Sequence, residues 1–434
     1  MSERKELDRL YQETKSDLLC NTSYPYHPEY FKEYLSDEDI MDGVDELSLY
    51  FHIPFCKSLC SFCEYTRFLP GGEEQEKRYL ELLGRQVDRY FTNHNTKLLY
   101  GLDIGGGTPS CLSERNIEKL LEMITEKIGS IPRVDDFESS FEFNYESINN
   151  MKIEILGRYG VSRVSSGVQI YDTNIMDLHN RKISGLEKML HINEQFRKEG
   201  IKKINLDIMY GFPNQDRRML ASTIHAIKLL DVDQITLYEM RYNQNGISSG
   251  TVNRESLYDQ YCYLYDQLTF MGYLARFGQN TFSKFEDEGV SSYLRYRMRK
   301  GVAYKGFGVS AQSMSWNGIS YNSLKGNTSS EMPYIDEILE RDSYKLPPEE
   351  IVAKYVSISL YNGCFDLDTI TKMIGNDAKK VYNEEVEYLL DKKYIQLVDR
   401  MVYVTEIGFK YYAVVAAFFW SKSHRAKYLE RKRV

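Results

Sequence analysis

Cysteine, long apolar runs and an excess of positive charge are all scarce in this sequence of 434 residues. Its longest apolar run, AVVAAFFW at 413–420, is far shorter than the roughly 18 residues that a membrane-spanning helix needs. Its first residues are charged and lack the apolar core of a signal peptide. We therefore expect a cytoplasmic protein with no membrane span.

The charge balance excludes a further class of function. Lys and Arg number 55 against 63 Asp and Glu, which gives a formal net charge of −8 at pH 7. Proteins that bind DNA or RNA through a basic surface have the opposite balance. We therefore expect no nucleic acid partner.

The cysteines number 7, an odd count that does not suit a disulfide framework, and the cytoplasm would keep them reduced. Three of them nevertheless crowd into FHIPFCKSLCSFCEYTRF at 51–68, with the spacing C-x3-C-x2-C. A structural zinc site needs four ligands, and no second pair follows. Three thiolates can instead hold a [4Fe–4S] cluster and leave its fourth iron open to a small molecule. Cys56, Cys60 and Cys63 are therefore candidate cluster ligands.

Alternating apolar β-type runs and amphipathic helical runs predict an α/β fold with a parallel sheet. We expect strands at 46–53, 98–105, 140–145, 161–169, 202–210 and 234–240, and helices near 73–92, 113–128, 147–159, 185–199, 216–230 and 255–272. No Rossmann glycine motif opens the first helix. A partial (β/α)6 barrel is therefore expected, and its chemistry should gather at the carboxyl ends of the strands.

Changes in composition and in the predicted secondary structure divide the chain into three parts. Residues 1–45 are an acidic, aromatic lead-in in which SYPYHPEY should be extended, because each proline biases its predecessor away from helix. Residues 46–345 hold the barrel and its extension. After the proline-marked KLPPEE, residues 346–434 read as helices followed by a short hairpin, which is the order of a small winged-helix-like α+β domain.

The motifs together carry a family resemblance. LYFHIPFC, GGGTPS, SSGVQIYD with LHNR, NLDIMYGFP, ITLYEM and GFGVSAQS occur in order over residues 46–315. This set resembles the radical S-adenosylmethionine (SAM) superfamily, in the branch of the oxygen-independent coproporphyrinogen III oxidases. That branch includes haem chaperones and class C radical SAM methyltransferases. The resemblance implies a [4Fe–4S] cluster whose open iron binds SAM.

The resemblance also assigns roles to residues of this chain. It implies that Tyr50 lies near the cluster and the SAM sulfonium. The residues implied to hold SAM are Gly106, Gly107, Thr108, Glu142, Gln169, Arg181 and Asp207. A second SAM would be contacted by Tyr238, Gly306, Gly308 and Ser310. Three purely structural interpretations stay open: a tight turn at GGGTPS, a helix cap at Asp207, and a β-turn at GFGVSA that closes the barrel.

In this family the reduced cluster cleaves SAM to a 5′-deoxyadenosyl radical, and the chain is expected to do the same. Two departures narrow the branch. Tyr65 stands where coproporphyrinogen oxidases carry a further cysteine. The H-N-x-x-Y-W stretch of the haem chaperones is missing, and no histidine lies between His225 and His424. We therefore favour methyl or methylene transfer from a second SAM to an organic substrate.

Two alternatives remain. One is an anaerobic tetrapyrrole enzyme, which removes carboxyl groups from coproporphyrinogen III or opens a haem ring. The other is a non-catalytic haem chaperone or cluster scaffold. The substrate could be a small molecule, a tetrapyrrole or a peptide, and an electron donor of the flavodoxin or ferredoxin type is expected.

Overall fold

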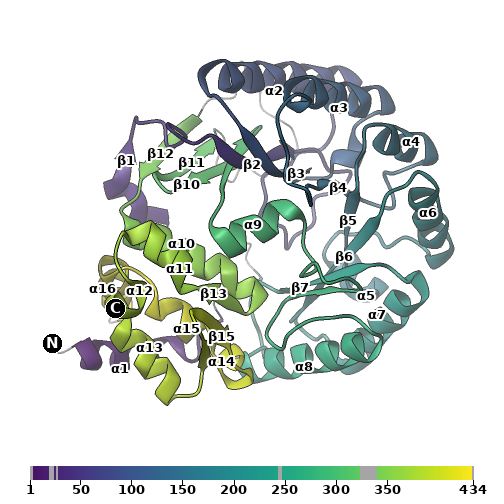
Figure 1. The fold of residues 1–434 in the computed structure, drawn as a ribbon. Helices are drawn as coiled ribbons and strands as arrows, with labels where there is room; N and C mark the ends of the chain where they lie inside the picture. The colour runs from purple at the N-terminus through teal and green to yellow at the C-terminus, as the bar shows by residue number, and fades with distance from the viewer. Residues whose placement is uncertain (1–2, 19–23, 26–27, 243–246, 323–339, 433–434) are drawn as a thin grey trace.

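A computed structural model gives the fold and describes residues 3–18, 24–25, 28–242, 247–322 and 340–432. One sheet dominates the molecule, and helices cover its outer face (Figure 1). Its parallel strands are, in spatial order, β9 (Ala303–Phe307), β2 (Glu46–Ile53), β3 (Leu98–Gly106), β4 (Ser139–Phe143), β5 (Arg163–Gln169), β6 (Lys203–Tyr210) and β7 (Gln234–Glu239).

Five further strands extend this sheet, and each of them pairs antiparallel with its neighbour. They are β8 (Thr281–Ser283) beside β7, and β10 (Gln312–Ser315), β11 (Gly318–Asn322), β12 (Glu340–Lys345) and β1 (Leu35–Ser36) beyond β9. Within the described residues, the sheet ends at β1 and β8 and does not close by hydrogen bonds. The predicted α/β class with a partial barrel is confirmed.

The six predicted strands are present within two residues of their expected bounds, but a seventh parallel strand was missed. β9 pairs with β2, with Tyr50 opposite Gly306. The residues of this pair lie about 250 positions apart in the chain, so no local pattern in the sequence signals their contact.

The outer helices are amphipathic and bury one face against the sheet. They are α2 (Glu73–Asn93), α3 (Glu114–Ile128), α4 (Asn150–Arg158), α6 (Leu186–Lys198), α7 (Arg217–Leu230) and α8 (Arg254–Phe270). The outward residues of β2, Leu47, Leu49 and Phe51, are fully buried beneath this layer. Burying such side chains contributes roughly 1.5–3 kcal/mol each.

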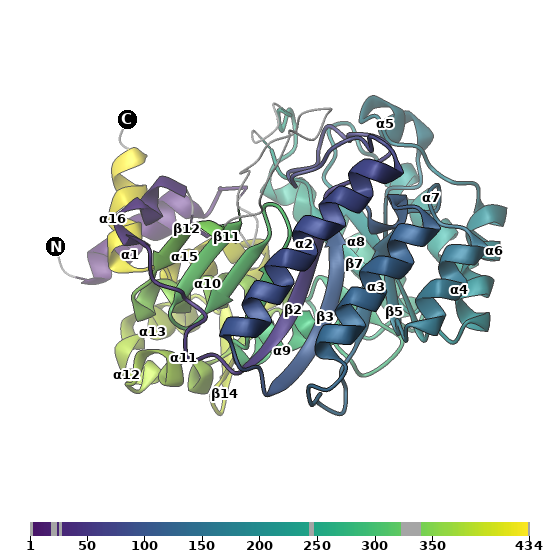
Figure 2. The same cartoon turned by 90° about the horizontal axis from the view of Figure 1, so that it is seen from above.

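The two ends of the barrel are covered differently. The helix α9 (Ser292–Lys300) lies across the amino ends of the strands, while α5 (Thr173–Leu178) lies at the opposite end (Figure 2). Ser292 Oγ accepts from the Glu138 N–H at 2.9 Å, and Ser291 Oγ donates to Asp103 Oδ2 at 2.8 Å. The carboxyl ends, where the motifs lie, stay free of α9.

The chain after the barrel forms a second small sheet with its own helices. Its antiparallel strands are β13 (Cys364–Asp366), β15 (Met401–Val404) and β14 (Ile395–Val398). The helices around it are α10 (Pro348–Ser359), α11 (Leu367–Ile374), α12 (Ala378–Val381), α13 (Asn383–Asp391), α14 (Glu406–Lys410), α15 (Tyr412–Phe418) and α16 (Lys422–Arg431). The predicted helices and hairpin are present, but the expected order missed β13, which lies between α10 and α11, and the three helices that follow the hairpin. The domain boundaries stay predictions.

The lead-in is more structured than the sequence suggested. The helix α1 (Glu3–Thr14) packs on α15, and Asp8 accepts from the Tyr388 hydroxyl of α13 at 2.8 Å. SYPYHPEY falls partly outside the described residues, and Pro28–Tyr34 forms a 3-10 helix rather than an extended segment. Among the described residues, no helix is long and apolar enough to cross a membrane.

Candidate radical SAM site

The cysteine loop leaves the carboxyl end of β2 and returns beside it. Its base is closed by two backbone bonds, Cys56 N–H to Phe68 O at 2.9 Å and Phe68 N–H to Pro54 O at 2.7 Å. Cys56 and Cys60 are buried and Cys63 is half-buried. The loop therefore presents three thiols from one short, anchored segment.

Residues from other strands reach the same thiols. Thr108 Oγ1, which follows β3, lies 3.5 Å from Cys56 Sγ. Arg181, which follows α5, donates to Cys60 Sγ at 3.5 Å and also to Gly167 O. Two residues predicted from the SAM motifs therefore lie beside the cysteines.

The three sulfurs are spread more widely than a single metal ion requires. Among the described residues, ligand atoms of three His, Cys, Asp or Glu side chains lie within 4.8 Å of one another only at Asp39, Asp42 and His94. Cysteine thiolates are the ligands that iron–sulfur clusters take. The donor set therefore fits a [4Fe–4S] cluster.

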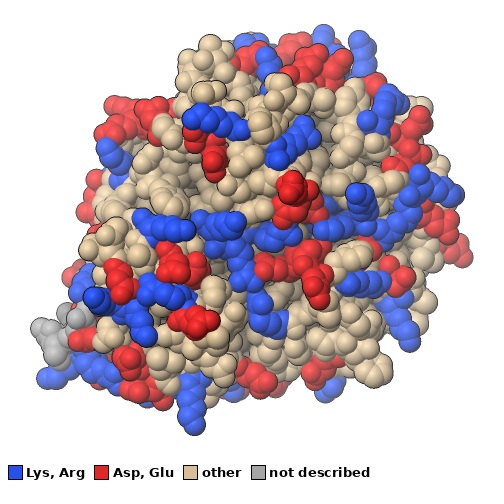
Figure 3. All heavy atoms as spheres, viewed as in Figure 1, with Lys and Arg blue, Asp and Glu red and all other residues tan. Residues whose placement is uncertain are grey.

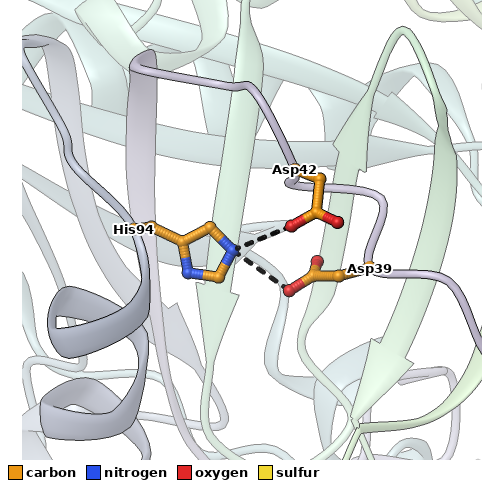
Figure 4. A group of neighbouring side chains, drawn as sticks. All are labelled: Asp39, Asp42 and His94. Atoms are coloured by element: carbon orange, nitrogen blue, oxygen red, sulfur yellow. Dashed lines mark ion pairs between the residues drawn. The ribbon is translucent and has the colours of Figure 1, made fainter.

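Asp39, Asp42 and His94 form a separate group, in which the histidine ring faces the two carboxyl groups (Figure 4). His94 Nε2 is 3.1 Å from Asp39 and 3.9 Å from Asp42, and its ring stacks on Tyr90. We interpret it as an ion pair that joins the lead-in to the end of α2.

Two thiols of the cysteine loop, those of Cys56 and Cys63, have raised pKa values. Burial raises the pKa of Cys56 to about 12, although the hydrogen bond with Thr108 opposes this rise. Burial also raises the pKa of Cys63, although the charge of Arg67 opposes this rise. Because metals bind the thiolate, cluster binding must displace these protons.

The glycine stretch after β3 allows close approach of three segments. Gly106 has φ 116°, and a Cβ atom there would lie 2.6 Å from His52 Nδ1. The Gly106 N–H donates to Glu142 Oε2 at 3.0 Å, and the Gly107 N–H donates to Ile53 O at 2.8 Å. The glycine stretch is therefore a tight turn. This does not exclude a role in SAM binding, because Gly106 is only half-buried and lies next to Glu142.

Two carboxyl groups project into the barrel near this stretch. Burial, together with the charge of Asp207, raises the pKa of Glu142 to about 8. Burial also raises the pKa of Asp207, whose oxygens accept from Asn205 at 2.8 Å and Ser165 at 3.3 Å. Since these contacts are with Asn205 of its own strand and Ser165 of the neighbouring strand, Asp207 does not cap a helix, and its charge acts on Glu142.

Gln169 ends β5 in an unusual conformation. Its φ is 69°, and its side-chain Oε1 is buried without a hydrogen-bond partner among the described residues. A Cβ atom on Gly167 would lie 2.3 Å from Gln169 Nε2 and 3.2 Å from Arg181 Nη2. An orphaned amide oxygen at this position suits a ligand that supplies a hydroxyl donor, such as a ribose.

The tyrosines of the site face inward. The Tyr50 hydroxyl lies 3.2 Å from His52 Nδ1, and burial together with the charge of Glu142 raises the pKa of Tyr50. The ring centroids of Tyr238 and Tyr361 lie 6.0 Å apart. Burial, together with the charge of Asp207, raises the pKa of Tyr238. Both tyrosines therefore point toward the acidic centre of the barrel.

The residues assigned to a second SAM also have packing roles. Gly306 and Gly308 are buried, and their carbonyls both accept from Asn322 Nδ2, at 3.2 and 2.7 Å. A Cβ atom on Gly308, whose φ is 96°, would lie 2.5 Å from His52 O. Ser310 accepts from Thr66 Oγ1 at 2.8 Å. These contacts account for the turn between β9 and β10, and a contact with a second SAM stays a prediction.

Sequence reasoning missed several residues of the site. Arg163 is buried inside the barrel, where it donates to Gln234 at 2.8 Å and to Ser140 at 3.0 Å. Asp103 points into the barrel from β3, and burial raises its pKa to about 7. Arg67 binds the cysteine loop itself. The alternation of side chains along a strand could have found Arg163 and Asp103. Arg163 lies opposite Ser140 on the neighbouring strand, and Asp103 shares a face of β3 with Gly105.

A family model matches the part of the chain that holds this site. Residues 50–227 match the model of the radical SAM superfamily. The chain carries a radical SAM domain. This domain runs from β2 to α7 and contains the three cysteines, the glycine stretch, Glu142 and Asp207.

This chain has curated relatives that are named as a heme chaperone and as oxygen-independent coproporphyrinogen III oxidases. It is 25% identical over 374 residues to the heme chaperone HemW of Bacillus subtilis, which covers 83% of this chain and 96% of the relative. It is 30% identical over 230 residues to the oxygen-independent coproporphyrinogen III oxidase of Helicobacter pylori, which covers 50% of this chain and 49% of that relative. The predicted branch is therefore confirmed.

A solved structure supports the fold. Coproporphyrinogen III oxidase (HemN) from Escherichia coli aligns with a TM-score of 0.71 and 22% identity, over 86% of this chain and 90% of that chain. Radical SAM proteins use a [4Fe–4S] cluster and SAM, and the residues described above fit both groups.

Proposed function

We propose that this protein is a radical SAM enzyme that acts on a tetrapyrrole. The observation that carries the proposal is that one barrel end combines the cysteine loop with the four side chains predicted to hold SAM, Glu142, Gln169, Arg181 and Asp207. A scaffold that only stored a cluster would not need these side chains.

Each part of the site has a role in this proposal. Cys56, Cys60 and Cys63 hold the cluster, which with bound SAM supplies one-electron reduction and an organic radical. Glu142 attracts the ammonium of SAM, and Arg181 holds the carboxylate of SAM. Gln169 and Asp207 accept from the ribose hydroxyls. Tyr50 covers the cluster side of the site and helps to exclude water.

The tetrapyrrole substrate is supported by the relatives and by an aromatic lining. Haem and coproporphyrinogen are both tetrapyrroles, and both appear in the names of the relatives. The Tyr65 side chain is 64% exposed, yet burial and the charge of Glu142 raise its pKa to about 12. Its interaction with Glu142 places the Tyr65 side chain next to the proposed SAM site. Tyr238 and Tyr361 lie in the same region and offer flat apolar surface.

Two alternative functions, methyl transfer and haem binding without catalysis, differ in the support that they receive. Methyl or methylene transfer from a second SAM, which the sequence favoured, receives no support from these relatives. The heme chaperone is a relative that matches most of this chain, which favours haem binding without turnover. Against this alternative, no histidine lies between His225 and His424 to ligate haem from that region.

The test measures SAM cleavage by anaerobically reconstituted protein with dithionite, with Cys63→Ala as the control. We expect 5′-deoxyadenosine from the wild type, little from the control, and more when coproporphyrinogen III or haem is added. S-adenosylhomocysteine or methylthioadenosine would favour transfer from a second SAM. A full cluster with no SAM cleavage under any of these conditions would contradict the enzyme and support the chaperone.

A further inference from the structure

Arg67 lies inside the cysteine loop and holds its backbone. Its guanidinium donates to Cys60 O at 2.6 Å, to Cys63 O at 2.8 Å and to Tyr65 O at 3.0 Å. Arg67 is 6% exposed, so water contributes little to these contacts. One side chain therefore fixes the carbonyls of two of the three cluster cysteines.

The charge of this guanidinium has no acidic counterpart nearby. Within the part of the chain that the structure describes, its bonds run to carbonyl oxygens, and its buried Nε has no acceptor. Carbonyls orient a cation but do not neutralise it, and an uncompensated buried charge is costly. The arrangement therefore favours an anion next to Arg67.

Two other cations near the cysteine loop are paired or exposed, while Arg181, which donates to Cys60 Sγ, is half-buried. Arg241 reaches the same loop but pairs with Glu64 at 2.5 Å. Lys57, beside Cys56, is exposed and donates to Glu146 O at 2.9 Å. Arg67 is thus a buried cation of the loop whose charge is left for an occupant of the loop.

We propose that Arg67 is a positioning residue that shapes the cysteine loop for the cluster and raises the cluster's reduction potential. The inference rests on the proposed function, since it needs the cluster. Three thiolates and their cluster carry net negative charge, and one added electron increases that charge. A fixed buried cation stabilises the reduced form more than the oxidised form, because reduction potentials of such clusters depend on local charge and hydrogen bonds.

The two roles can be separated with matched variants. Arg67→Gln removes the charge and keeps one amide donor for the loop. Arg67→Lys keeps the charge but cannot reach three carbonyls with the same planar fork. Lys57→Gln removes an exposed charge of the same loop and serves as the control. Circular dichroism and thermal melting of the cluster-free proteins report whether each variant folds.

The experiment reconstitutes each protein anaerobically with iron and sulfide and measures iron content. A titration with dithionite, followed by electron paramagnetic resonance of the reduced cluster, then gives the potential. At a fixed potential, we expect Arg67→Gln to lower the ratio of reduced to oxidised cluster about tenfold, which is about 59 mV for one electron. Arg67→Lys should keep the potential but bind less iron, and Lys57→Gln should match the wild type in both.

Each failure has a distinct meaning. A wild-type protein that binds no cluster would overturn the proposed function. A folded Arg67→Gln with the iron content and potential of a cluster-bearing wild type would overturn only the role of Arg67. A potential shift of equal size in Lys57→Gln would also overturn it, because the effect would then be that of any nearby charge.

Discussion

The amino and carboxyl ends of the barrel are both polar, but their buried charges are partnered differently. At the amino end, Lys203 lies 2.5 Å from both Glu138 and Asp287, and Glu138 bonds in turn to Ser292 of α9. At the carboxyl end, Glu142 keeps a raised pKa and Gln169 Oε1 has no partner. Polar groups of the same sheet thus stabilise the fold at one end and are left for ligands at the other.

The surface shows the same contrast in charge. The face that covers the amino end mixes Lys and Arg with Asp and Glu (Figure 3). Its charges can pair with one another, as Arg295 does with Asp136 at 2.7 Å. Around the barrel centre, by contrast, Asp103, Glu142 and Asp207 face one buried cation, Arg163, whose charge lowers the pKa of all three. Excess acidity inside the carboxyl half suits a cationic ligand such as SAM.

The largest effect on stability is expected at the partnered end. Lys203→Met would leave Glu138 and Asp287 mostly buried and facing one another without a cation. Breaking a buried pair in this way costs about 3–5 kcal/mol of unfolding free energy. Urea unfolding should show this loss, while SAM binding by the protein that remains folded should be unchanged.

Lys202→Met is the matched control, since Lys202 is exposed next to Lys203. It should change the unfolding free energy by less than about 0.5 kcal/mol. Equal, small losses in both variants would show that the amino-end network does not stabilise the fold, and the contrast between the two ends would fail.

The next largest effect is expected on ligand binding at the open end. Asp207→Ala removes an acceptor for the SAM ribose, and we expect SAM affinity to fall about 30-fold, which is about 2 kcal/mol. The iron content should stay at the wild-type level, because Asp207 does not contact the cysteine loop.

Isothermal titration of the reconstituted proteins with SAM measures this effect. Asp177→Ala, an exposed acid of α5 at the same end, is the control and should bind SAM like the wild type. Unchanged affinity in Asp207→Ala would remove this residue from the SAM site.

The amino-acid sequence predicts the carboxyl end of the barrel better than the amino end. The carboxyl-end residues follow directly from motifs at strand ends, such as GGGTPS after β3. The amino-end network joins Glu138, Lys203, Asp287 and Ser292, which lie in four segments without a shared motif. Only the folded sheet brings them together.

Arg67 was missed for a related reason. Its partners are backbone carbonyls, which every residue has, so no residue type in the sequence marks them. β9 was missed because parallel pairing with β2 is a long-range contact. Helix α1 was missed because its charged sequence buries only a narrow stripe that includes Leu7 and Leu10 against the C-terminal helices.

A pH series should produce a smaller, diagnostic effect at the open end. Glu142 has a pKa of about 8 in the folded chain, well above its ordinary value of 4.5, so it is mostly protonated at neutral pH. The ammonium of SAM favours the carboxylate, so affinity should rise with pH from 6.5 to 8.5, by up to about tenfold per pH unit. The stability of the SAM-free chain has the opposite sign and should fall as pH rises from 4.5 through 8.

Glu142→Gln isolates the contribution of this carboxyl group. The amino group of SAM also titrates in this range, but it does so equally in both proteins. The difference in pH slope between wild type and variant therefore reports Glu142 alone. Parallel slopes would mean that Glu142 does not meet the SAM ammonium.

The smallest effect is expected for an exposed pair near the end of α2. His94→Phe keeps an aromatic ring beside Tyr90 but removes the ion pairs to Asp39 and Asp42. Because Asp42 is 80% exposed at its side chain, solvent already screens its charge, and the loss should be below about 1 kcal/mol by urea unfolding. A loss as large as that of Lys203→Met would show that pairing alone, rather than burial of the pair, determines stability. The small expected loss would instead confirm that the amino-end network is strong because its carboxylates are withdrawn from water.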